Sequence, residues 1–86
     1  MKLIKEDERG KVFEIKDFKI FYRNKGSISG DNNANLYEKI IFISGNAKVT
    51  LGDKVWEIKS PCEIEFPEKK YHKIEALSDI IFVLFG

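Results

Sequence analysis

The sequence predicts an all-β domain, built as an antiparallel sandwich or barrel, and three observations support this fold class. No stretch of ten residues in the chain shows a convincing helical period of apolar side chains. Eight or more short segments instead alternate apolar and polar residues, which is the pattern of half-buried strands. Turn-forming residues separate these segments every several positions, as they do in all-β domains.

Length and charge limit what the chain can be. Its 86 residues suffice for one modest core, so we expect a single domain over residues 1–86, with an N-terminal segment at 1–10 and a barrel at 11–85. The formal net charge is +1, and basic residues are scattered among acidic ones. The adjacent pair Lys69-Lys70 is typical of a solvated turn, so we expect no nucleic-acid partner.

Cysteine usage and hydropathy indicate the compartment. The single cysteine, Cys62, excludes an intrachain disulfide and is expected to act as a small buried hydrophobe. The N-terminus becomes charged after two apolar residues, and the longest apolar run, residues 80–85, is too short to span a bilayer. We therefore expect a cytoplasmic protein with no membrane partner.

In the N-terminal third, residues 2–4 could form an edge strand and residues 6–10 indicate a charged turn that ends in glycine. Alternation predicts two strands, at residues 12–15 and 18–23. Residues 26–35 are rich in turn formers and offer little to bury. We expect them to form a long mobile loop.

The next strand is predicted at residues 37–43, where Glu38 shares one face with two apolar side chains. A hairpin follows, and its Gly52-Asp53 connection pairs Val49 with Trp56. Trp56 is thus predicted to point inward, as a core side chain or as a surface on which a sugar ring could stack.

The chain's single histidine lies in the next predicted pair of strands. Alternation ends at Pro67 in the first strand, because proline has no N–H for the ladder. In the second strand His72 shares a face with Ile74, so it should point inward. We expect the two strands to form a hairpin that places Phe66 opposite His72.

Two predicted strands are apolar on both faces, at residues 40–43 and 80–85. A small barrel would leave one of these faces in water, as a patch on the order of several hundred Å², which is more than monomers usually expose. We expect a homodimer packed through these strands. The alternative is that N-terminal strands of the same chain cover this surface.

The segment around the histidine resembles a motif of the cupin superfamily. Pro67-x-Lys69-x-x-His72 is similar to the second cupin motif, G-x5-P-x-G-x2-H-x3-N. Pro61 and Lys69 stand where the motif has its two glycines, and Ala76 stands where it has asparagine.

An upstream segment has the spacing of the first cupin motif, G-x5-H-x-H-x3-4-E-x6-G. Gly26, Glu38 and Gly45 match it, whereas Asn32 and Ala34 replace its two histidines. With both motifs in the right order over roughly residues 20–85, the resemblance sharpens the expected fold to a small jelly-roll barrel of the cupin type.

The resemblance also bears on metal binding. In cupins that hold a metal, two histidines and a glutamate of the first motif join one histidine of the second. By position this chain retains Glu38 and His72, and two protein ligands fall short of the three expected at a catalytic site. The amide of Asn32 would be a weak ligand for a transition metal. We expect no tightly bound metal or other cofactor; a divalent transition metal, if bound, would be held by Glu38, His72 and Asn32.

What the chain retains is a carboxylate and an imidazole that should converge inside an apolar cavity. We expect Glu38 and His72 to bind a small polar ligand, a sugar or small carboxylic acid. Further candidate ligand-binding residues are Asn32, Tyr22, Arg23 and Trp56, and Arg23 could instead be exposed. Alternatively, Glu38 and His72 satisfy each other and merely fill the former metal position.

Other functions stay open. One is a metal-independent isomerase or epimerase of a sugar or nucleotide-sugar, with His72 as base and Tyr22 or Glu38 as acid. The run Asp7-Glu8-Arg9-Gly10 is similar to the opening of some cupin sugar isomerases and epimerases. The others are a metal-dependent cupin enzyme with a reduced ligand set and an interaction role for the dimer itself.

Overall fold

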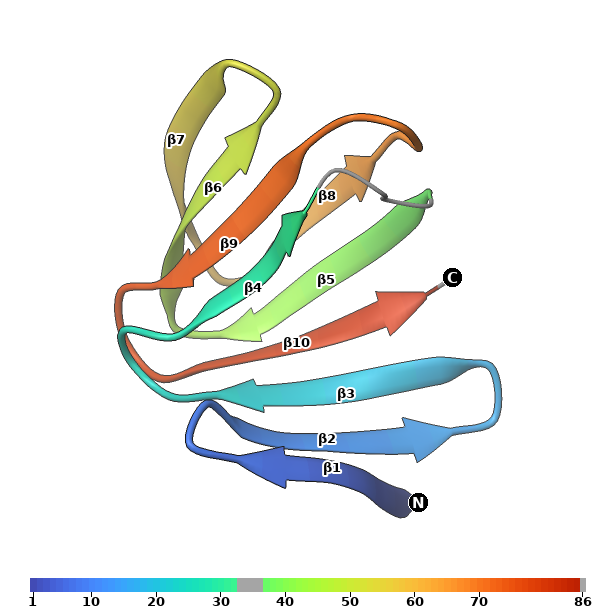
Figure 1. The fold of residues 1–86 in the computed structure, drawn as a ribbon. Coiled ribbons are helices and arrows are strands. Elements are labelled where there is room, and N and C mark those ends of the chain that lie inside the picture. The colour runs from blue at the N-terminus through green and yellow to red at the C-terminus, as the bar shows by residue number, and fades with distance from the viewer. Residues whose placement is uncertain (33–36, 86) are drawn as a thin grey trace.

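The computed structural model describes residues 1–32 and 37–85, and over these residues the chain is all β (Figure 1). The described part contains no helix, and therefore none that could cross a membrane. Its strands are β1 (Lys2–Asp7), β2 (Gly10–Ile15), β3 (Phe18–Arg23), β4 (Ile28–Asn32), β5 (Glu38–Ser44), β6 (Asn46–Leu51), β7 (Lys54–Lys59), β8 (Cys62–Phe66), β9 (His72–Ala76) and β10 (Ile80–Phe85).

The strands form two sheets. The larger has the order β1-β2-β3-β10-β5-β8 and the smaller the order β4-β9-β6-β7. All the paired strands are antiparallel. Figure 1 shows the smaller sheet lying over the β10-β5-β8 side of the larger one, with β1 and β2 continuing the larger sheet at its other edge.

The core lies between the two sheets and follows from alternation along the strands. On β5, Ile40 and Phe42 are almost fully buried, as the sequence predicts for the face that they share with Glu38. The smaller sheet contributes Val49 and Ile74, which lie opposite each other on β6 and β9. Burial of these side chains is the main favourable term that holds the sheets together.

The strand partners near the histidine differ from the predicted hairpin. β8 pairs with β5, where Phe66 lies opposite Glu38, and β9 pairs with β6, where His72 lies opposite Leu51. Residues 67–71 therefore cross from one sheet to the other. Alternation fixes which face a side chain takes but not which strand becomes its neighbour, and this explains the error. The predicted pairing of Val49 with Trp56 in the β6–β7 hairpin is confirmed.

The expected loop at 26–35 is partly wrong. Residues 28–32 form β4, which pairs with β9 by backbone hydrogen bonding and so needs little apolar surface of its own. Gly30 within it has a φ of +75°, a conformation that side-chain-bearing residues rarely adopt. The rest of the expected loop, residues 33–35, lies outside the described residues.

The N-terminal strands widen the apolar face of the larger sheet and do not cover it. Because β1, β2 and β3 lie beside β10 in one sheet, their apolar side chains join those of β5 and β10 on the side away from the core. The alternative that these strands cover the surface is therefore wrong. We call this surface the outer face; it comprises Leu3, Phe13, Ile15, Phe18, Ile20, Tyr22, Ile41, Ile43, Ile81, Val83 and Phe85.

Candidate functional site

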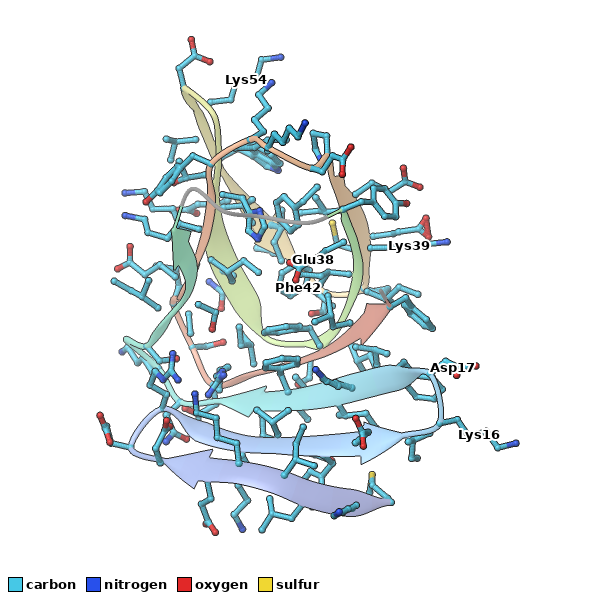
Figure 2. The ribbon with its side chains drawn as sticks, turned by 45° about the vertical axis from the view of Figure 1, so that its right-hand side comes forward. Lys16, Asp17, Glu38, Lys39, Phe42 and Lys54 are labelled. Carbon is cyan, nitrogen blue, oxygen red and sulfur yellow. The ribbon has the colours of Figure 1, made fainter. Side chains whose placement is uncertain are left out.

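The structure brings Glu38 and His72 together from opposite sheets. Each is the first residue of its strand, β5 or β9, and the Nε2 atom of His72 lies 3.1 Å from Oε1 of Glu38. The side chain of His72 is 3% exposed and that of Glu38 is 30% exposed. Figure 2 shows Glu38 pointing into the space between the sheets, whereas Lys39 points away from it. Solvent therefore reaches this pair through the carboxylate.

The imidazole of His72 is closely packed by Phe66 and Gly30. One face stacks on Phe66, with ring centroids 4.3 Å apart. The backbone of Gly30 also lies so close that an added Cβ would be 2.9 Å from Cδ2 and 3.0 Å from Nε2 of the ring. Nδ1 is buried and has no hydrogen-bond partner among the described residues. Because Nε2 faces Glu38 and Nδ1 is buried, His72 acts on the cleft through Glu38.

A cleft of about 350 Å³ opens beside Glu38. The β2–β3 hairpin, the start of β5 and the end of β10 supply its walls. Its lining comprises Glu14, Lys16, Asp17, Phe18, Lys19, Tyr37, Glu38 and Leu84.

Lys19 is one of the two lysines that line this cleft, and it lies on the inward side of the larger sheet. It is half-buried and lies opposite Glu14 and Leu84 in the register of the larger sheet. In the described part of the chain it forms no ion pair. The sequence analysis missed it, although the alternation that places Phe21 in the core also places Lys19 on the inward side.

Tyr22 does not lie at the site. It belongs to the outer face, where it lies opposite Lys11 and Ile81 and meets Phe13 edge to face at 5.6 Å. It lines a separate cavity of about 480 Å³. A strand directs successive side chains to opposite sides of the sheet, so Tyr22 cannot act as the acid beside His72.

Arg23 is inward but lies at the far end of the barrel. Arg23 lies opposite Ile80 on β10, four residues along that strand from Leu84. Leu84 lies opposite Ile40 on β5, and Glu38 is two residues further along in the same direction. At about 3.3 Å per residue this places Arg23 about 20 Å from Glu38. Its 5% exposure rules out the alternative that Arg23 is simply exposed.

The remaining candidates are only partly placed. Trp56 lies on the inward side of the edge strand β7 and is 36% exposed, so it is not a core tryptophan, and it does not line the cleft. The backbone of Asn32 lies opposite His72, while its side chain and Ala34 lie outside the described structure.

The resemblance of this chain to known proteins is one of fold. No protein-family model and no curated protein matches this sequence. Among solved structures, the capsular polysaccharide assembling protein CapF from Staphylococcus aureus is 17% identical over 99% of this chain, with a TM-score of 0.80. A cupin-2 domain from Rhodospirillum rubrum is 15% identical over 86% of this chain and 55% of its own, with a TM-score of 0.72. A cupin 2 conserved barrel domain protein from Salinispora arenicola CNS-205 is 15% identical over 95% of this chain and 80% of its own, with a TM-score of 0.67.

The chain has the cupin fold. The all-β jelly roll that the two motifs implied is thereby confirmed. The chain spans 28% of the CapF chain, so the likeness to CapF concerns one part of that protein.

The donor set of this cupin barrel can be compared with what a resident metal requires. Glu38 and His72 lie where an ion could contact both, but within residues 1–30 and 37–85 no third histidine, cysteine, aspartate or glutamate joins them. A catalytic zinc site uses three protein ligands, and structural sites use four. The described side chains of this barrel do not make up such a set.

Proposed function

We propose that this cupin binds a small polar ligand, a sugar or small carboxylic acid, in the cleft beside Glu38. One observation carries the proposal: the carboxylate of Glu38 contacts buried His72 with one oxygen and still lines a solvent-filled cleft. A carboxylate with one side fixed inside a barrel is a preorganised acceptor for a ligand hydroxyl. The cleft volume of about 350 Å³ lies near the lower end of about 300–1,000 Å³ for ligand pockets.

The position of Lys19 narrows the ligand class. Lys19 lies opposite Leu84, Leu84 lies opposite Ile40, and Glu38 is two residues from Ile40. At about 4.8 Å between strands and about 3.4 Å per residue, the Cα atoms of Lys19 and Glu38 are about 12 Å apart. A molecule with a hydroxyl for Glu38 and a carboxylate for Lys19 would satisfy both, and a sugar acid has both groups.

Two further considerations favour binding over catalysis. Of the two acids considered for an isomerase, Tyr22 lies on the outer face, and Glu38 lies beside a His72 that is almost fully buried and therefore poorly placed to act as a base on a ligand in the cleft. A sugar-type ligand also agrees with the name of the neighbour CapF, an assembling protein of capsular polysaccharide.

Shift mapping by NMR tests this proposal with three probes of matched size: glucose, glucuronate and gluconate. We expect shifts at the cleft residues, with glucuronate or gluconate binding at least tenfold more tightly than glucose. Glu38→Gln should weaken binding of all three, while Lys19→Met should abolish the preference for the acids. Lys39→Met, on the outward side beside Glu38, is the matched control and should change nothing.

Two outcomes would overturn the proposal. One is the absence of any shift near Glu38 with these probes and a wider library of sugars and small acids. The other is a stoichiometric amount of iron, zinc, nickel or manganese in the purified protein, because metal-dependent chemistry would then replace simple binding.

We infer that the partner of the outer face is a second copy of this chain. The face carries apolar side chains on five neighbouring strands of one sheet, and Leu3, Tyr22 and Ile43 on it are each at least 40% exposed. Pairing two such faces would remove this apolar area from water, which is the main driving force for stable association.

A further inference from the structure

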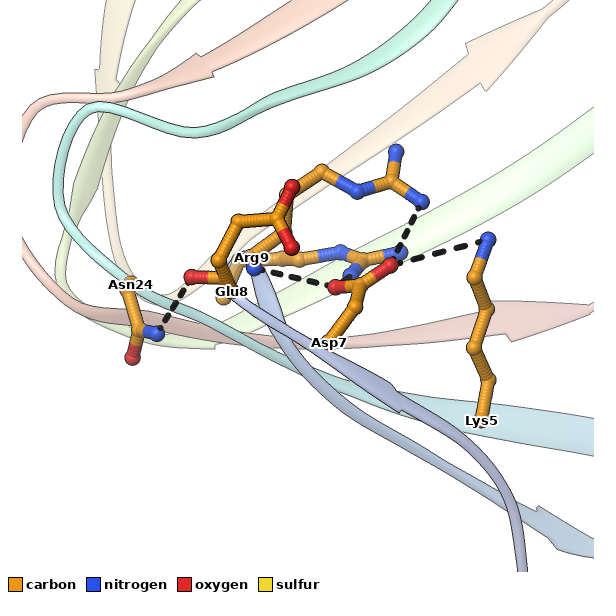
Figure 3. A network of polar contacts seen from close by, with 6 residues as sticks. Lys5, Asp7, Glu8, Arg9 and Asn24 are labelled. Atoms are coloured by element: carbon orange, nitrogen blue, oxygen red, sulfur yellow. Dashed lines mark hydrogen bonds and ion pairs between the residues drawn. The ribbon is translucent and has the colours of Figure 1, made fainter.

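Four charged side chains meet at the end of the barrel opposite the cleft, and we call them the Asp7 cluster: Lys5, Asp7, Arg9 and Arg23 (Figure 3). Oδ2 of Asp7 lies 3.2 Å from Nη2 of Arg9 and 3.9 Å from Nζ of Lys5. Oδ1 lies 3.9 Å from Nη1 of Arg23. Three cations thus surround one carboxylate, which leaves a formal charge of +2. The two arginines of this cluster are also the only two in the sequence.

Arg23 is the member whose environment is incomplete. Its side chain is 4% exposed, and its guanidinium carbon lies 5.1 Å from the centre of the Phe21 ring. Nε and Nη1 are buried and have no hydrogen-bond partner among the described residues, because Asp7 at 3.9 Å is beyond hydrogen-bond length. A buried donor without an acceptor is costly and is rare in folded proteins.

Electrostatics within the cluster agree with this geometry. Burial lowers the pKa of Arg23 from its ordinary value, the positive charge of Arg9 lowers it further, and the carboxylate of Asp7 opposes both effects. Arginine nevertheless remains protonated in proteins. A second negative group near Arg23 would counter both the burial and the repulsion by Arg9.

The described chain does not provide that second negative group. Glu6 is paired with Lys11 at 3.7 Å, and Oδ1 of Asp79 accepts a hydrogen bond from the backbone N–H of Lys25 at 2.8 Å. Glu8 has no ion pair with the cluster. Lys5 and Arg9 are 53% and 35% exposed, so a solute can reach the cluster from outside.

We propose that the Asp7 cluster binds a phosphate group. A charge of +2 matches a phosphate dianion better than a single carboxylate. Guanidinium groups present planar sets of donors that suit phosphate oxygens, and such charge-assisted hydrogen bonds are stronger than neutral ones. The site lies on another part of the barrel from the cleft beside Glu38, so it can be tested independently of the ligand proposed there.

Calorimetric titration of the full chain with inorganic phosphate, in chloride buffer at constant ionic strength, tests this site. We expect saturable binding that Arg9→Gln weakens at least tenfold. Asp7→Asn should tighten binding several-fold, because it removes the carboxylate that competes for the same donors. Lys48→Gln, an exposed lysine on β6, is the control and should bind phosphate as the wild type does.

Arg23→Met should also abolish binding. Because that variant removes a buried side chain and could fail to fold, the test rests on Arg9→Gln. Three results would each overturn the proposal: no saturable binding to the wild type, undiminished binding to Arg9→Gln, or acetate binding as tightly as phosphate, which would assign the site to carboxylates.

Discussion

The imidazole of His72 and the phenyl ring of Phe66 stack with their planes only 17° apart. Phe66 ends β8 in the larger sheet and His72 begins β9 in the smaller, so the stack joins the two sheets across the turn at residues 67–71. His72 is therefore both a core side chain and the residue that contacts the Glu38 carboxylate. Substitutions around it should change stability and ligand binding together.

The first prediction concerns the two glycines on either side of the start of β4. Gly30→Ala should lower the free energy of unfolding by about 2–5 kcal/mol, because a left-handed residue other than glycine costs about 1–2 kcal/mol and overpacking about 1–3 kcal/mol more. Gly26→Ala has a similar φ of +88° but open space around its Cβ, so it should cost only the backbone part. Urea denaturation measures both. Equal losses for the two variants would show that the contact of Gly30 with His72 is unimportant.

The second prediction separates the two roles of His72. His72→Ala should destabilise the protein by about 3 kcal/mol, near the lower end of about 3–5 kcal/mol for truncating a buried aromatic ring. His72→Phe retains the ring stack and should cost less, yet it leaves Glu38 without its nitrogen partner. We expect the affinity of the cleft for sugar acids to fall in both variants. Undiminished affinity in His72→Phe would mean that the contact with His72 does not orient Glu38.

The third prediction is a pH dependence at Asp7. A hydrogen bond from the backbone N–H of Arg9, followed by the hydrogen bond and charge of the Arg9 side chain, holds the pKa of Asp7 below its usual value of 3.8, although desolvation opposes this. A lowered pKa in the folded state stabilises the protein above pH 3.8, and the benefit disappears as the pH falls through the folded-state pKa. The difference in unfolding free energy between wild type and Asp7→Asn should therefore be constant near neutrality and shrink below pH 3.8.

Arg9→Ala refines that measurement. This variant retains the backbone N–H that bonds to Asp7. When Asp7→Asn is added to it, part of the pH-dependent difference in unfolding free energy should therefore remain. A difference that does not change with pH between 6 and 2 would contradict the assigned role of Asp7.

The fourth prediction concerns self-association through the outer face. Ile43→Glu should convert a dimer into monomers, because it places a charge in an apolar contact. Val55→Glu is the matched control: Val55 has the same 54% exposure but lies on β7, away from that face, and its variant should remain dimeric. Analytical ultracentrifugation over a range of concentrations distinguishes the two. A wild-type chain that stays monomeric at the highest concentration would refute the inference.

Much of the strand pattern could be predicted from the sequence, because alternation depends only on neighbours along the chain. The inward side of β5, the β6–β7 hairpin and the inward His72 follow from that pattern, and the structure has all three. The two cupin motifs added the jelly-roll topology through Glu38 and His72. The same rule could have identified Lys19, since it shares the inward side of β3 with Phe21.

Partner choice and burial depth required the tertiary structure. Strands distant in sequence compete as neighbours, and closing a longer loop costs little more than closing a short one. The pairing of β8 with β5, rather than with the adjacent β9, is therefore not decided by distance along the chain. Which side of an apolar strand faces the core also depends on the opposing sheet, which is why Tyr22 lies on the outer face and Arg23 is buried. Alternation along the chain predicts most of the strands and the side that each of their residues takes, but it misses β4, whose residues are rich in turn formers. The packing of two sheets decided which of those side chains meet, because such contacts join residues that are far apart along the chain.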